Sequence, residues 1–145
     1  MIPLVVLIAA VAIARLSGAM GVDALASWPA ATRVGLAIMF LFTAAAHFTA
    51  TRADLIRMVP PAFPRPEALV AATGLAELAG AIFLLVPSTA RLAADALIVL
   101  LIAMFPANVH AARRGHTIAG RRATPLAIRA PLQLAWIGLL WWSVR

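Results

Sequence analysis

Long apolar runs dominate this chain and are separated by short stretches rich in Pro, Gly and Arg. Hydrophobic residues make up 64% of the sequence and charged residues only 12%, which is about half of their share in soluble domains. A transmembrane helix needs about 20 mainly apolar residues. The runs give five candidate spans, at residues 2–20, 34–50, 68–86, 92–112 and 128–144. The sequence therefore predicts one all-α integral membrane domain over residues 1–145, built as an antiparallel transmembrane helix bundle.

The basic residues indicate how these spans are oriented. All 12 are arginines, and they flank the apolar runs. With five spans, most of them fall on the side that holds the 51–67 and 113–127 loops, namely Arg52, Arg57, Arg65, Arg113, Arg114, Arg121, Arg122 and Arg129. Cytoplasmic loops carry an excess of basic residues. We therefore expect a multi-pass protein of the inner (plasma) membrane, with the N-terminus cytoplasmic and the C-terminus outside, and with the lipid bilayer rather than nucleic acid as its partner.

Several local features add expectations. Trp28, Trp141 and Trp142 would form an aromatic belt at the outer interface. Asp95 follows Arg91 by one helical turn, which predicts a local ion pair. The stretch 54–66 has too many prolines for a helix, so it is predicted as a loop at the inner interface. The first run opens without a basic residue, which favours a retained span over a cleaved signal peptide.

Polar side chains within the spans are the candidate functional residues, because each costs free energy in hydrocarbon unless it pairs or lines a cavity. His47, Asn108, His110 and Gln133 lie within roughly two turns of the cytoplasmic helix ends, and Glu77 lies near mid-span. We predict one inward-facing polar pocket with Glu77 at its floor. Glu77 and His47 would be catalytic, and Asn108, His110 and Gln133 would bind the ligand. The alternative is a structural set: a neutral, hydrogen-bonded acid and polar caps at helix ends.

Small residues and a proline surround this set. Gly74 and Gly80 flank Glu77, and Ala76 with Gly80 forms a pair of small residues that lets another helix approach closely. Pro106 frees a backbone carbonyl one turn earlier, just before Asn108 and His110 begin. Both features fit helix packing as well as function.

The absence of cysteine limits the chemistry. Disulfide exchange, thiolate nucleophiles, iron–sulfur clusters and Cys-bound metals are excluded, and no metal site is predicted. Any redox chemistry would belong to a bound cofactor or to a partner protein.

Four short segments resemble the DoxX-like family of small bacterial membrane proteins. They are His-Phe-Thr at 47–49, Met-Val-Pro-Pro at 58–61 with Pro64, Gly-Leu-Ala-Glu-Leu-Ala-Gly at 74–80, and Phe-Pro-Ala-Asn-Val-His at 105–110. The resemblance covers about residues 33–142. It implies a four-helix membrane core to which the first span is an N-terminal addition, a link to quinone-coupled or other membrane oxidoreductase systems, and importance for His47, Glu77, Asn108 and His110. It assigns no catalytic step, and it does not establish whether the protein is an enzyme.

Three functions follow as hypotheses. The first is a redox-associated subunit or accessory whose pocket binds a quinone-like ligand, with electrons supplied by an oxidoreductase partner, since imidazole and carboxyl groups can relay the protons. A haem held between His47 and His110 is a less favoured variant. The second is a small proton-coupled carrier, which would need to form a homodimer. The third is a scaffold without a ligand, in which polar residues only fix helix packing.

Overall fold

The computed structural model of the protein describes residues 2–115, 117–118, 120–122 and 124–145. The described chain is almost wholly helical. Its elements are α1 (Ile2–Ala19), the short 3-10 helix η1 (Asp23–Leu25), α2 (Trp28–Ala46), α3 (Arg52–Met58), α4 (Pro66–Leu84), α5 (Ala90–Arg114), the two-residue strands β1 (Thr117–Ile118) and β2 (Arg121–Arg122), and α6 (Leu126–Ser143). The strands pair antiparallel to each other in the connection between α5 and α6.

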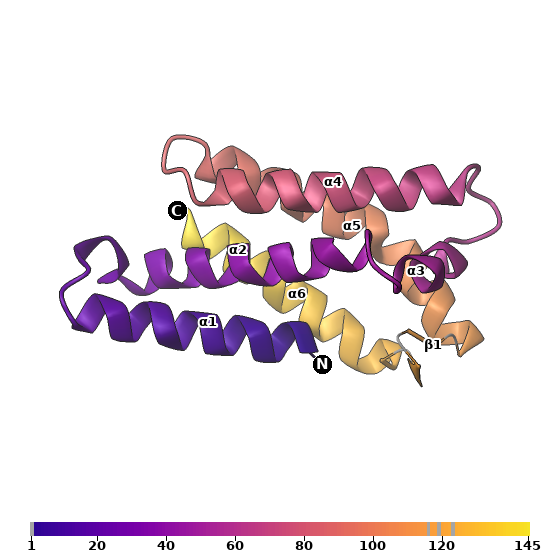
Figure 1. The fold of residues 1–145 in the computed structure, drawn as a ribbon, viewed down its shortest axis with the longest axis horizontal. Coiled ribbons are helices and arrows are strands. Elements are labelled where there is room, and N and C mark those ends of the chain that lie inside the picture. The colour runs from indigo at the N-terminus through magenta and orange to yellow at the C-terminus, as the bar shows by residue number, and fades with distance from the viewer. Residues whose placement is uncertain (1, 116, 119, 123) are drawn as a thin grey trace.

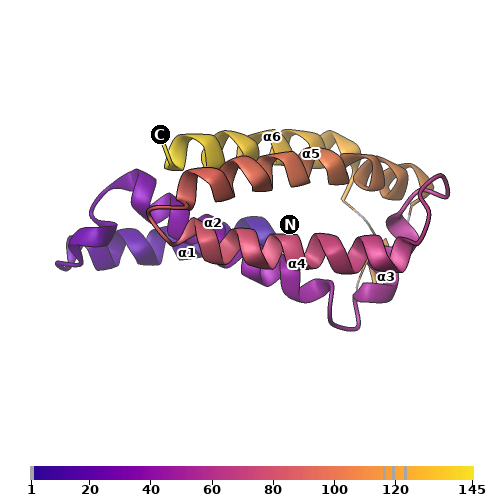
Figure 2. The same cartoon turned by 90° about the horizontal axis from the view of Figure 1, so that it is seen from above.

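The long helices lie in two layers, and consecutive long helices run in opposite directions (Figure 1). Helices α1, α2 and α4 form one layer, and α5 with α6 forms the other, as the view from above shows (Figure 2). Helix α2 has the most neighbours, because it packs against α1, α4 and α6. One end of the molecule carries α3 and the β1–β2 hairpin, and the other carries η1, the α4–α5 turn and the C-terminus (Figure 1).

The core lies where the two layers meet. Its largest fully buried side chains are apolar and come from α2, α4, α5 and α6, namely Leu36, Met39, Phe40, Leu84, Leu97 and Leu140. Gly80 permits the contact between α4 and α5, because a Cβ at this position would lie 2.6 Å from the Leu97 Cδ2 atom. The predicted close approach of a helix at Gly80 is thus present, and its partner is α5.

The outer surface is apolar as well. Large exposed side chains include Ile8 and Leu16 on α1, Leu75 on α4 and Leu92 and Val99 on α5. Four helices, α1, α2, α4 and α5, are long and apolar enough to cross a membrane. This is compatible with the predicted membrane protein. The fifth predicted span, 128–144, corresponds to α6, which Arg129, Pro131 and Gln133 interrupt and which is not among the four.

Two predicted boundaries were wrong. The second helix begins at Trp28 rather than near residue 34, because the Ser27 side chain accepts a bond from the Ala30 N–H at 3.2 Å and Pro29 occupies the first turn. The stretch predicted as a loop over 54–66 begins with helix α3, which ends at Met58 before the prolines start. Proline is excluded from the interior of a helix but not from the residues that follow it.

Arg15, which interrupts the first apolar run, ties α1 to the segment after it. Its Nη1 atom donates to the backbone carbonyls of Leu25, at 3.1 Å, and of Ala26. Its guanidinium also lies 4.8 Å from the centre of the Trp28 ring. The Arg15 side chain therefore connects α1 to η1 and to the start of α2.

The helical spacing predicted an ion pair between Asp95 and Arg91, and this prediction was wrong. Asp95 pairs with Arg145 across the α5–α6 interface, with 3.1 Å between Asp95 Oδ1 and Arg145 Nη2. The Arg145 guanidinium also stacks on Trp141, at 5.1 Å from the ring centre. The ion pair is at the expected end of the molecule but links two helices rather than two turns of one helix. Trp28, Trp141 and Trp142 lie at this same end and are exposed.

Candidate functional site

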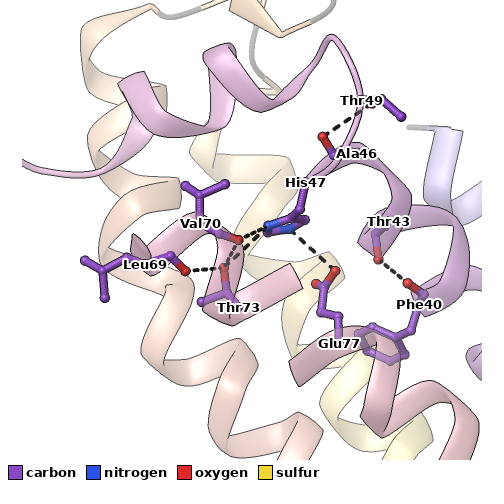
Figure 3. A network of polar contacts seen from close by, with 9 residues as sticks. All are labelled: Phe40, Thr43, Ala46, His47, Thr49, Leu69, Val70, Thr73 and Glu77. Atoms are coloured by element: carbon purple, nitrogen blue, oxygen red, sulfur yellow. Dashed lines mark hydrogen bonds and ion pairs between the residues drawn. The ribbon is translucent and has the colours of Figure 1, made fainter. Parts of the chain in front are cut away.

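His47 forms the centre of a buried polar cluster between α2 and α4 (Figure 3). It is the C-cap residue that directly follows α2, and its Nδ1 atom lies 2.7 Å from the carbonyl oxygen of Val70. A carbonyl oxygen only accepts, so Nδ1 donates this bond. The Thr73 hydroxyl lies 3.4 Å from the same nitrogen and donates to backbone carbonyls of its own helix, those of Leu69 and Val70. The imidazole is therefore fixed on one side, and its Nε2 atom points the other way.

The Glu77 carboxyl lies on that other side. Its Oε2 atom is 3.6 Å from His47 Nε2, and both residues are only 5% exposed. Within the part of the chain that the structure describes, Oε2 is a buried atom without a hydrogen-bond partner. The Thr43 hydroxyl also interacts with the carboxyl, while it donates to the Phe40 carbonyl. The unsatisfied hydrogen-bonding atom of this cluster, Glu77 Oε2, therefore faces the imidazole.

This geometry can hold one proton between the two side chains. Because the Nδ1 hydrogen is used by Val70, a neutral His47 presents a bare lone pair at Nε2. A proton in this space would stand either on the Glu77 carboxyl or on Nε2, and both states contain the same number of protons. Without that proton, a buried carboxylate would face a bare imidazole, which is costly in a dry interior. The arrangement therefore favours one proton that the two groups share.

Gly74 makes the cluster possible. A Cβ on this residue would lie 2.4 Å from His47 Cβ and 2.7 Å from His47 Cγ, which is closer than atoms can approach. Gly74 and Glu77 are three residues apart, so they lie on the same face of α4. The sequence indicated close helix packing at Gly74 but gave no sign that a functional imidazole would be the group in contact.

His47 lies closer to Glu77 than predicted. The sequence placed it some turns closer to the cytoplasmic side than Glu77, whereas the two side chains are neighbours. The reason is that α2 ends at Ala46, so its last turn packs beside the stretch of α4 from Val70 to Glu77. Offsets of this kind between helices depend on tertiary packing and leave no periodic signal in the sequence.

Asn108 belongs to a second cluster, between α5 and α6. Its Oδ1 atom accepts a hydrogen bond from Arg129 Nη1 at 2.5 Å, and Arg129 Nε donates to the Thr124 carbonyl at 3.2 Å. Both residues are half-buried. Arg129 entered the sequence analysis only as a marker of membrane orientation, so its part in this cluster was missed. The feature of the sequence that could have revealed this role was the position of Arg129, a cation, within an apolar run.

Gln133 and His110 complete the predicted set. Gln133 is buried, and its Nε2 atom donates to the Leu101 carbonyl of α5 at 3.0 Å. Pro106 removes the N–H that would bond to the next carbonyl along α5, that of Ile102, so Gln133 supports the helix beside this break. His110 is half-buried in the last turns of α5. The hydrogen bond of Gln133 is therefore a helix-to-helix contact, like that of Asn108.

The contacts described above for the predicted pocket residues thus fall into two sets. His47 and Glu77 come together, whereas Asn108 and Gln133 bond to Arg129 and Leu101. Two cavities, of about 420 and 220 Å³, lie between α1 and α2 and beside the end of α2, and neither is lined by Glu77 or His47. Among the described residues, no three His, Asp or Glu side chains gather closely enough to hold a metal ion. His47 Nε2, the nitrogen that a haem iron would have to reach, faces the Glu77 carboxyl.

Comparison with known proteins gives one match. A family described as a domain of unknown function (DUF8561) matches residues 36–145, which include His47, Glu77, Asn108, His110 and Gln133 but leave α1 outside. No curated protein and no solved structure matches the chain. Because the match covers more than half of the sequence, the protein belongs to the DUF8561 family.

Proposed function

We propose that the protein is an integral membrane protein whose buried His47–Glu77 pair holds one exchangeable proton on behalf of a redox partner. The observation that carries this proposal is the Glu77 Oε2 atom, which is buried, has no hydrogen-bond partner among the described residues and faces His47 Nε2 at 3.6 Å. Ionisable groups inside a membrane protein are costly and tend to mark proton or ligand pathways. A purely structural acid would be expected to have its oxygens satisfied.

The redox assignment rests on the DoxX-like resemblance of the segments around His47, Glu77 and Asn108. The chain has no cysteine and no nucleotide-binding motif, so the electrons would come from an oxidoreductase partner. A quinone-like ligand would supply two-electron chemistry that takes up protons. The two side chains are each only 5% exposed, which leaves little surface for the ring of such a ligand. The proposal for this site is therefore limited to the proton.

The proposed membrane arrangement is a DoxX-like core of α2, α4, α5 and α6, with α1 as an N-terminal addition and the α3 end in the cytoplasm. It rests on the arginines near that end, including Arg52, Arg57, Arg113 and Arg114. A topology reporter fused after Arg145 should then report the outside of the cell. A cytoplasmic signal would mean that α6 or α1 does not span.

Infrared spectroscopy of the purified protein in lipid tests the proton directly. Titration with pH should reveal one buried carboxyl whose C=O band shifts on transfer to D₂O, and Glu77→Gln should remove that band. Glu67 offers a matched control, since it is the other glutamate of α4 and is exposed in the first turn. Glu67→Gln should leave the band in place. A band that survives Glu77→Gln, or that never exchanges with D₂O, would overturn the proton site.

A scaffold is the second candidate, and the α5–α6 contacts favour it. The hydrogen bonds of Asn108 and Gln133 both go to other parts of the protein, as expected for residues that fix helix packing. The two functions separate in a partner pull-down. A scaffold with Glu77→Gln should bind and support its oxidoreductase normally, whereas the proton-holding subunit should bind it and fail to support turnover.

A further inference from the structure

The hydrogen-bonding groups around His47 and Glu77 form one chain across the α2–α4 interface (Figure 3). At one end, the Thr73 hydroxyl lies 3.4 Å from His47 Nδ1. The imidazole then faces the Glu77 carboxyl through Nε2, at 3.6 Å from Oε2. At the other end, the Thr43 hydroxyl interacts with the same carboxyl. A proton on the pair therefore has two directions in which to leave, past Thr73 or past Thr43.

The Thr43 direction ends in the apolar core. The Thr43 hydroxyl donates to the Phe40 carbonyl, and Phe40 is only 2% exposed. The neighbouring side chains Met39 and Leu36 of α2 are fully buried as well. Apolar side chains neither donate nor accept hydrogen bonds. A proton that passed Thr43 would therefore meet apolar side chains and not water.

The Thr73 direction leads to the surface at the α3 end of the molecule, where α4 begins (Figure 1). Thr73 is half-buried, and its hydroxyl donates to the Leu69 carbonyl at 2.9 Å. Leu69 is 37% exposed and follows Glu67, whose side chain is exposed in the first turn of α4, by two residues. Because charges are costly in hydrocarbon, an exposed acid at a helix start marks the end of the helix that water reaches. Thr73 therefore connects the buried imidazole to this region.

We propose that Thr73 is the outlet of the His47–Glu77 pair, through which the pair exchanges its proton with water at the α3 end only. This inference rests on the proton-holding function proposed above. A hydroxyl suits the role because it accepts one hydrogen bond while it donates another. The imidazole suits it because its two nitrogens face opposite ways, Nδ1 toward Thr73 and Nε2 toward Glu77.

Release of the proton proceeds in three transfers. The Glu77 carboxyl gives its proton to His47 Nε2, and Nδ1 gives its own proton to the Thr73 oxygen. The hydrogen that Thr73 had donated to the Leu69 carbonyl then passes to a water molecule. One proton has left in all, and a Glu77 carboxylate faces the new N–H at Nε2. The Thr73 hydroxyl now donates to the bare Nδ1, which replaces the bond that Nδ1 had donated to Val70.

A single outlet gives the site one accessible side. The α3 end carries Arg52, Arg57, Arg113 and Arg114, and the proposed membrane arrangement places it in the cytoplasm. The pair would then take its proton from the cytoplasm and return it there. A proton-coupled carrier instead needs access to both sides of the membrane in turn. The one-sided outlet therefore favours a proton store for a partner over a carrier.

The rate at which the Glu77 carboxyl band shifts in D₂O tests the outlet. The protein in lipid is mixed rapidly with D₂O and followed by infrared spectroscopy. Thr73→Val keeps the side-chain shape and removes the hydroxyl, so we expect exchange about a hundredfold slower, the lower end of what a positioned proton-transfer group contributes. Thr73→Ser should exchange like the wild type. So should Thr49→Val, the control, because Thr49 is exposed at the same end and its hydroxyl donates to the Ala46 carbonyl.

Thr43→Val separates the two directions. It should move the band, because the Thr43 hydroxyl interacts with the carboxyl, but it should slow exchange less than Thr73→Val does. Wild-type exchange in Thr73→Val, or a larger slowing by Thr43→Val, would overturn the outlet and leave the proton site intact. A wild-type band that never exchanges would remove the proton site itself, so the two failures are distinguishable.

A blocking experiment keeps Thr73 in place and so tests the route even if Thr73→Val does not fold. The chain has no cysteine, so a single introduced cysteine is the only thiol that a maleimide can label. Leu69→Cys should exchange normally until a bulky maleimide is attached, and slowly afterwards. Leu75→Cys is the control, because Leu75 lies further along α4 and is 61% exposed. Equal effects of the two labels would contradict an outlet at the α3 end.

Discussion

The α2–α4 and α5–α6 interfaces both bury polar side chains in an apolar protein, but they differ in how fully these side chains are hydrogen-bonded. At α5–α6, Asn108 bonds to Arg129 and Gln133 bonds to the Leu101 carbonyl. At α2–α4, one nitrogen of the His47 imidazole is hydrogen-bonded, and the facing Glu77 oxygen has no hydrogen-bond partner in the part of the chain that the structure describes. Satisfied polar groups join helices, whereas a buried group left unsatisfied calls for an explanation such as an exchangeable proton.

The largest expected effect comes from Gly74→Ala, which fills the space that the close packing of α2 against α4 requires. Its new Cβ would lie 2.4 Å from His47 Cβ, so the helices must separate. We expect a loss of about 1–3 kcal/mol in the free energy of unfolding, the usual cost of overpacking. Gly138→Ala in α6 is the control, because a Cβ there meets nothing within 4 Å. Unfolding in detergent measures both, and equal stability would contradict the tight contact.

A double-mutant cycle on His47 and Glu77 should give the next largest effect. His47→Leu alone leaves the Glu77 carboxyl buried without its facing imidazole, and Glu77→Leu alone removes the proton site. Replacement of both partners by apolar groups costs less than the sum of the single changes. We expect a coupling of about 1–2 kcal/mol in unfolding free energy. Additive single changes would mean that the pair is not energetically linked.

Gln133→Leu should have a smaller effect at the other interface. It removes one hydrogen bond to the Leu101 carbonyl and puts an apolar side chain of similar size in place of the polar one. Helix-to-helix hydrogen bonds in membrane proteins are worth about 0.6 kcal/mol on average. The same unfolding measurement should show a loss of this order and no change in the infrared carboxyl band.

Glu77→Gln should alter stability least of all, by less than about 0.6 kcal/mol, because it keeps the side-chain volume and a donor toward His47. This is the reverse of its expected effect on function, since glutamine has no proton to release. A stability loss as large as that of Gly74→Ala would show that the carboxyl is mainly structural, and the scaffold function would then be preferred.

The sequence predicted the helices and singled out His47 and Glu77 as candidates because both steps rest on local information. Apolar runs of sufficient length define the helices, and an acid in the middle of one stands out. The contacts were harder to predict. Asp95 was assigned to Arg91 by helical spacing, whereas it pairs with Arg145, 50 residues away. The meeting of His47 with Glu77 depends on where α2 ends, and the apolar pattern continues past that point into Phe48.

The single pocket stays a prediction, but the hydrogen-bond partners of its members were not foreseen, for the same reason. Residues were grouped by their depth along separate helices, and depth alone does not say which side of a helix faces which neighbour. Arg129 donates a hydrogen bond to the Asn108 oxygen, and Gln133 donates one to a backbone carbonyl of α5 that precedes Pro106. From the sequence, an arginine at the edge of a span is explained by membrane orientation, so its hydrogen bonds were not anticipated.

The contacts of Arg15 have a consequence for biosynthesis. Among the described residues, its hydrogen bonds reach to Leu25 and Ala26 and its ring contact to Trp28, so these contacts of the turn between α1 and α2 involve no later residue. Chains are made from the N-terminus, and early segments can fold first. An α1–α2 hairpin closed by its own arginine can therefore form as a unit, and α4 and α6 can pack afterwards against α2.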